Sequence, residues 1–167
     1  MNRPARLSRL CAVTLVCCAA TSTAWAAGQV HVQFVDPQHY ADIGVGSVDR
    51  QRNLDLLAAH MREWAPLLPD GQRLTIDVLD VDLAGNTHVL FAHPEIRVLR
   101  GRADWPQMQL RWTISDAKGT TLRSGDSSIS DMSYLTGSAT VADQGALTYD
   151  LRMLDRWLHR QVLVPGA

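Results

Sequence analysis

The sequence predicts an α+β fold: a two-layer sandwich in which a five-stranded, mainly antiparallel sheet carries two helices on one of its faces. Three observations favour this fold class. Several segments alternate apolar and polar residues, two others repeat apolar residues every three or four positions, and the clearest strand has one wholly polar face. The elements follow in the order strand, helix, four strands, helix. With 46% hydrophobic and 20% charged residues, the composition is typical of a globular protein.

The first 26 residues have the pattern of a cleaved signal peptide. Three arginines open the segment, an apolar stretch covers residues 10–20, and Ala-Trp-Ala at residues 24–26 matches the small-x-small site that signal peptidase cleaves. We therefore expect residues 1–26 to be removed and residues 27–167 to form a single α+β domain. This predicts a periplasmic protein, with secretion to the medium as the alternative.

All three cysteines lie in the segment that is expected to be removed, so the mature domain has no disulfide and no thiol nucleophile. A lipoprotein requires a small residue before the acylated cysteine. Val16 precedes Cys17, and Cys17 itself precedes Cys18, so we expect no lipid anchor. No later apolar run approaches the roughly 20 residues of a membrane span.

Removal of the signal peptide also changes the charge. The full chain has 16 basic and 17 acidic residues, and the loss of Arg3, Arg6 and Arg9 leaves 13 basic residues and a net charge of about −4. Binding to nucleic acid or to an anionic membrane requires a basic surface. The composition therefore argues against both partners.

The first two elements are a strand and a helix. Residues 29–35 alternate in the pattern of a half-buried strand. Ser47 is a good N-cap for a helix over residues 48–65, in which apolar residues recur at three- and four-residue steps. Prolines and a glycine follow, and they end the helix.

Four strands and a second helix follow. Residues 73–81, 95–100 and 107–115 have strand patterns, and in the last of these every second residue is apolar. A tight turn from Asp116 to Gly119 returns the chain into a serine-rich fifth strand at residues 121–129, with the weak apolar character of a sheet edge. An apolar stripe then predicts a helix over residues 147–163.

The second and third predicted strands carry complementary charges. Residues 76–82 (Ile-Asp-Val-Leu-Asp-Val-Asp) match residues 96–102 (Ile-Arg-Val-Leu-Arg-Gly-Arg), with every aspartate replaced by arginine. We expect the two strands to be antiparallel neighbours, with Asp77 beside Arg102 and Asp82 beside Arg97. A parallel arrangement, with Asp77 beside Arg97, is the alternative.

The same charges raise two further questions. In both segments two charges three residues apart flank a Val-Leu pair, which requires a β-bulge or the end of a strand. The charged side chains form either a polar site at the end of the sheet or cross-strand ion pairs that set the register.

Several segments together resemble a known family. They are Val35-Asp36-Pro37, Leu79-Asp80-Val81-Asp82-Leu83-Ala84-Gly85, Arg97-Val98-Leu99-Arg100-Gly101-Arg102-Ala103-Asp104-Trp105-Pro106, Ser130-Asp131-Met132-Ser133-Tyr134-Leu135 and Arg152-Met153-Leu154-Asp155-Arg156-Trp157. The set is similar to a family of small exported proteobacterial proteins known as domain of unknown function 3016. The resemblance implies one domain after a signal peptide and assigns no catalytic residue.

Motifs for catalysis and metal binding are weak. Residues 125–128 (Gly-Asp-Ser-Ser) are similar to a hydrolase nucleophile block, but Asp155 and His159 are spaced one residue too far apart for its partner motif. His88 and His93 lack the further ligands that a zinc site requires. We expect no metal and no cofactor.

The leading hypothesis is a non-enzymatic binding or accessory module whose partner is an envelope protein or an extended ligand. The alternative is a carboxylate-dependent hydrolase around Asp80, Asp82 and Asp104. A further candidate surface is the polar face of residues 107–115, bordered by Trp105 and Tyr134. The candidate binding residues are Asp80, Asp82, Arg100, Arg102, Asp104, Trp105, Arg111 and Tyr134.

Overall fold

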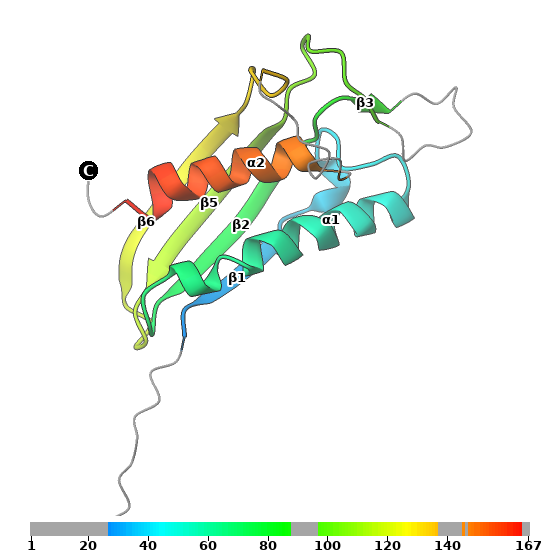
Figure 1. Ribbon diagram of the computed structural model, residues 1–167. Helices are drawn as coiled ribbons and strands as arrows, with labels where there is room; N and C mark the ends of the chain where they lie inside the picture. The colour runs from blue at the N-terminus through cyan, green and yellow to red at the C-terminus, as the bar shows by residue number, and fades with distance from the viewer. Residues whose placement is uncertain (1–26, 88–96, 137–144, 146, 165–167) are drawn as a thin grey trace, which may run out of the picture.

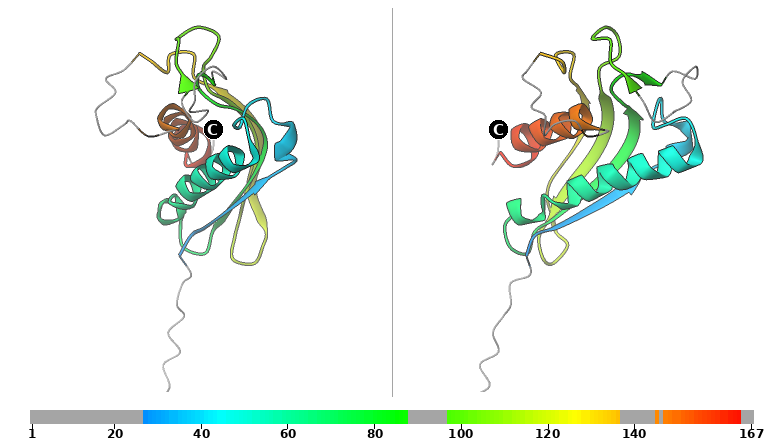
Figure 2. Two further views of the ribbon diagram at one scale, coloured as in Figure 1. Left: turned by 90° about the vertical axis from the view of Figure 1, so that its right-hand side faces the viewer. Right: turned by 45° about the vertical axis from the view of Figure 1, so that its right-hand side comes forward.

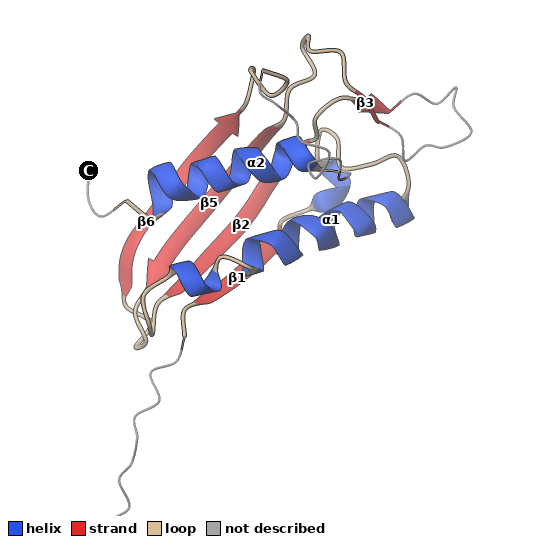
Figure 3. Cartoon of the chain, viewed as in Figure 1, coloured by secondary structure: helices blue, strands red, loops and turns tan. Residues whose placement is uncertain are grey.

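Four strands form one mixed sheet in the order β1-β2-β5-β6 (Figures 1 and 3). The computed structural model describes residues 27–87, 97–136, 145 and 147–164. β1 is parallel to β2, whereas β2, β5 and β6 are antiparallel to their neighbours. The strands are β1 (Gln29–Phe34), β2 (Arg73–Asp82), β5 (Gln107–Ser115) and β6 (Thr121–Ser130).

The predicted five-stranded sheet is wrong in one element. Of the expected strand at residues 95–100, residues 95 and 96 lie outside the described residues, and only Arg97–Val98 (β4) is extended. β4 pairs with Asn86–Thr87 (β3) in a separate two-stranded sheet. Both edges of β2 are already occupied, one by β1 and the other by β5, so β4 has no place beside β2.

The expected pairing of the aspartate and arginine strands is therefore also wrong, in either orientation. Asp77 lies opposite Arg111 of β5, and Asp82 lies opposite Gln107. Of the two irregularities expected around the Val-Leu pair, a bulge or a strand end, β2 has the bulge, because its register with β5 shifts between Val78 and Asp80. The extra residue places the charges on either side of the Val-Leu pair on the same side of the strand.

Two helices cover one face of the sheet (Figure 2). α1 (Ser47–Arg62) connects β1 to β2, and α2 (Thr148–Trp157) continues into the π-helical segment η4 (Leu158–Val162). The 3₁₀ turns η1 (Pro37–His39) and η2 (Ala65–Leu67) precede and follow α1. The expected helix over residues 48–65 thus ends at Arg62, three residues early, whereas α2 and η4 together match the expected helix over residues 147–163.

The core lies between the helices and the sheet. Alternate residues of β2 and β5, such as Ile76 and Leu110, are buried against Leu57 and Met61 of α1 and Leu154 of α2 in one cluster. The other residues of β5 lie on the opposite face, which none of the described helices covers (Figure 2). None of the described helices is long and apolar enough to cross a membrane.

β6 is an edge strand within the described part of the chain, as its serine-rich sequence predicts. The tight turn before it is also confirmed. The N–H of Gly119 donates to the carbonyl of Asp116 at 3.0 Å, and Gly119 has a positive φ of 84° that suits glycine.

Candidate functional site

Asp104 organises the loop between β4 and β5. Its carboxylate accepts hydrogen bonds from the backbone N–H groups of Arg100 (2.6 Å) and Arg102 (2.9 Å). Burial alone would raise the pKa of Asp104, but the hydrogen bonds from Arg100, the Tyr134 hydroxyl and Arg102 together hold it below its ordinary value. A carboxylate engaged in this way stabilises the loop and is poorly placed to act as a general base.

Tyr134 is buried beside the same loop, with 2% of its surface exposed. Its hydroxyl accepts a hydrogen bond from the N–H of Gly101, and its ring contacts Tyr149 of α2 edge-on with 5.1 Å between ring centres. The expectation that Tyr134 borders the open face of the sheet is therefore wrong. Trp105 is half-buried, and its indole N–H is buried without a hydrogen-bond partner among the described residues.

Asp80 and Asp82 lie at the end of β2, next to the segment that leads into α1. One oxygen of Asp80 accepts the N–H of Ala41 at 2.9 Å, and Asp82 forms an isolated parallel bridge with Asp42. Burial raises the pKa of Asp82, and the negative charge of Asp42 raises it further, whereas the nearby Arg97 lowers it. Arg97 thus lies close to Asp82 although their strands do not pair.

Arg97 connects several segments at this end of the sheet. Its Nη2 atom lies 2.7 Å from Oδ2 of Asp42, and its guanidinium also donates to the carbonyls of Leu83, Ala84 and Gly85 at 2.6–2.9 Å. Only 11% of the Arg97 side chain is exposed. The guanidinium therefore stabilises the turn after β2.

Asp150 of α2 reaches the same turn from the other side. Its carboxylate accepts the N–H of Ala84 at 3.0 Å, and burial raises its pKa to about 7. Sequence reasoning missed Asp150 as a structural acid. The available signal was its position, because Asp150 lies three residues after Leu147 and four before Leu154 on the apolar stripe of the helix.

The three acids of the hydrolase alternative differ in their surroundings. Asp80 and Asp104 are both engaged by backbone N–H groups, and the charges that act on Asp82 come from Asp42, Arg97 and Asp80. Among the described residues no three histidine or acidic side chains are grouped so that they could hold a metal ion. His88 and His93 lie outside the described residues.

The serine block in β6 makes contacts with β5 and η4. Asp126 forms an ion pair with Arg111 at 2.9 Å, and the hydroxyl of Ser127 donates to Gln161 at 3.0 Å. Asp155 lies 2.7 Å from His60 of α1 and also accepts the indole N–H of Trp64 at 3.0 Å. These contacts give the block a structural role.

A groove of about 690 Å³ lies between the end of β6 and the helix pair α2 and η4. Asp131, just after β6, forms an ion pair with Arg156 of α2 across it, while Arg160 is exposed. The groove is lined by Ser128, Ile129, Ser130, Asp131, Met132, Ser133, Met153, Arg156, Trp157, Arg160 and Gln161.

The open edge of β6 borders this groove. The N–H of Asp131 donates to the carbonyl of Pro106 at 3.2 Å, so it points toward β5. Amide groups alternate in direction along an antiparallel strand, so those of Ser128 and Ser130 point away from β5 toward the open edge. Backbone donors and acceptors on an open edge are able to pair with a further strand.

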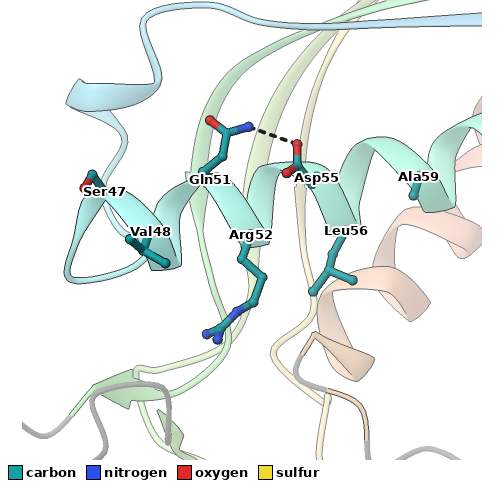
Figure 4. A pocket seen from close by; sticks show the side chains of 7 residues that line it. All are labelled: Ser47, Val48, Gln51, Arg52, Asp55, Leu56 and Ala59. Atoms are coloured by element: carbon teal, nitrogen blue, oxygen red, sulfur yellow. Dashed lines mark hydrogen bonds between the residues drawn. The ribbon is translucent and has the colours of Figure 1, made fainter.

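A second hollow lies on the outer face of α1 (Figure 4). Val48 and Leu56 expose apolar surface there, with 78% and 41% of their areas accessible. Arg52 lies between them and forms an ion pair with Asp49 at 3.1 Å. The hollow is shallow, and Gln51 donates to Asp55 at 2.9 Å, so these polar groups are engaged with each other and offer little to orient a ligand.

The matched family model covers residues 28–160 and bears the description "Protein of unknown function (DUF3016)". The chain belongs to this family. No curated protein and no solved structure matches it. The DUF3016 region begins one residue before β1 and ends at Arg160 in η4, so it includes the β6 edge and the helix beside it.

Proposed function

We propose that this DUF3016 protein is an exported, non-enzymatic binding module of the periplasm that binds an extended peptide segment of a partner along the open edge of β6. Secretion to the medium is the alternative location. The observation that carries the proposal is the combination of two features: outward-facing amides at Ser128 and Ser130, and an adjoining groove of about 690 Å³. An added strand would pair with the edge and place alternate side chains in the groove.

The groove supports binding better than the open polar face of β5 does. Arg111 on that face already pairs with Asp126 and lies opposite Asp77, so its charge is engaged within the sheet. The groove offers a buried floor, Met153 and Trp157, together with polar groups at its rim. The groove is concave and has polar groups that can orient a ligand.

Hydrogen exchange tests the proposal directly. The probe is a capped, uncharged peptide of about eight residues that alternates threonine and glutamine, a length that pairs along a whole strand. We expect it to slow amide exchange at Ser128 and Ser130. Unchanged exchange at both amides, or slower exchange only in β5 around Thr113, would contradict the proposal.

Two substitutions at Ser128 separate the backbone from the side chain. Ser128→Pro removes the outward N–H without removing a hydrogen bond to β5, because an edge position tolerates proline. We expect this variant to lose binding of the peptide. Ser128→Ala keeps the N–H and removes only the hydroxyl, so binding should persist. Equal binding by both variants would exclude strand addition at this edge.

A further inference from the structure

Positive charge gathers along the helix that borders the groove. Arg152, Arg156 and Arg160 are spaced four residues apart through α2 and η4, a spacing that keeps them on one side of the helix. Arg156 pairs with Asp131, and Arg152 lies over the ring of Tyr149 at 5.3 Å. Arg160 forms no ion pair within the described part of the chain. It is the cation best placed to meet a ligand.

Negative charge gathers elsewhere. Asp42, Asp80 and Asp82 lie together at the end of β2, where Arg97 is their nearest cation. Among the described residues that line the groove, Asp131 is the only acid, and it is engaged by Arg156 and by the N–H and hydroxyl of Ser133. The groove is thus locally positive on a chain whose formal charge is negative.

A second cation lies farther along β6. Arg123 donates to the carbonyls of Gln161, Val162 and Val164 at 2.7–2.9 Å. Because these partners are neutral, they orient the guanidinium without cancelling its charge. Arg123 and Arg160 therefore both lie near the short segment that follows α2.

We infer that the segment bound along β6 is acidic, with at least one carboxylate beside Arg160. This inference rests on the proposed function. α2 lies across β6 rather than along it (Figure 1). Only a few residues of a strand added to β6 would therefore lie near the arginines. One or two carboxylates on alternate residues of the peptide, about 6.6 Å apart, are enough to meet Arg160 and the outer side of Arg156.

Three labelled peptides of equal length test this inference by fluorescence polarisation. All alternate threonine with a second residue, which is glutamate, glutamine or lysine. We expect the glutamate peptide to bind at least about tenfold more tightly than the glutamine peptide and the lysine peptide to bind more weakly than both. The advantage of glutamate should shrink as salt is raised from about 0.05 M to about 0.5 M.

Arg160→Glu identifies the residue responsible. We expect this variant to bind the glutamate peptide about tenfold or more less tightly than the unaltered protein does. Its affinity for the glutamine peptide should change by no more than about twofold. Arg62→Glu is the matched control, because Arg62 is also an exposed arginine at the end of a helix and lies outside the groove. Arg62→Glu should bind all three peptides as the unaltered protein does.

The outcomes distinguish the inference from the proposed function. If the glutamate and glutamine peptides bind equally and both protect Ser128 and Ser130, the acidic partner is overturned and strand addition stands. If neither peptide protects these amides, both are overturned. If polyphosphate displaces the glutamate peptide and Ser128→Pro binds it normally, the groove is a general polyanion site, and both are overturned as well.

Discussion

Asp150 of α2 accepts a hydrogen bond from the backbone N–H of Ala84, 3.0 Å away, and this contact joins the last helix to the turn that follows β2. Arg97 binds the same turn through three carbonyls and pairs with Asp42. Asp150 and Arg97 therefore hold the turn at the end of β2, an inner strand, while the groove lies at the end of β6, an edge strand of the described sheet.

Asp150 should make stability depend on pH. Burial raises its pKa from 3.8 to about 7, so between these values the folded chain holds a proton that the unfolded chain releases. The stabilisation that protonated Asp150 gives the folded state is fully present below the unfolded pKa and is lost as pH rises through about 7. The free energy of unfolding then falls by at most about 1.4 kcal/mol per pH unit. Asp150→Asn, which keeps the acceptor oxygen and has no charge, should be more stable than the unaltered protein at pH 8. Urea unfolding at pH 5 and pH 8 measures the difference, and parallel pH dependence of the two proteins would refute this role.

Arg97→Met should destabilise the fold strongly. The substitution leaves Asp42 and three carbonyls without their donor, and breaking a buried ion pair in this way costs about 3 kcal/mol or more. Arg111→Met is the matched control, because it breaks an exposed pair with Asp126 and should cost less than about 1 kcal/mol. Urea unfolding of both variants measures the loss of stability in each. Similar losses would show that the Arg97 contacts contribute little to the stability of the fold.

Gly85→Ala should be more harmful than Gly119→Ala. Both glycines have positive φ, 76° and 84°, so both substitutions carry a backbone cost of about 1 kcal/mol or slightly more. A Cβ at Gly85 would also lie 2.6 Å from the Leu99 side chain and 2.8 Å from the carbonyl of Val98, whereas a Cβ at Gly119 meets nothing within 4 Å. The thermal unfolding temperature of Gly85→Ala should therefore lie well below that of Gly119→Ala. The reverse order would mean that the turn after β2 is loosely packed.

Export should leave a mature chain that begins at Ala27. The arginine-rich start, the apolar stretch and the Ala-Trp-Ala site together specify cleavage, and Val16 before Cys17 disfavours lipidation. The intact mass of the protein purified from the cell envelope should equal that of residues 27–167. A mass that includes residues 1–26, or fatty acids on Cys17 or Cys18, would contradict cleavage at this site.

The sequence by itself determined the local elements. The two-residue alternation in β5, the slip around Val78 and Leu79, the Asp116 turn and the serine-rich edge β6 all agree with the structure. These features depend on neighbouring residues, because the direction of each side chain follows from the local backbone period. The family resemblance rested on such segments, and it too is confirmed.

Only the tertiary structure decided which elements meet. β1 takes the place beside β2 that the charge pattern assigned to residues 97–102, since complementary charges on the exposed side of a strand stabilise a pairing far less than burial of its apolar face does. The burial of Asp150 depends likewise on how α2 packs against the turn at Ala84. The groove between β6 and α2 joins residues 20 to 33 positions apart in the sequence, and contacts at such separation depend on the packing of the whole chain.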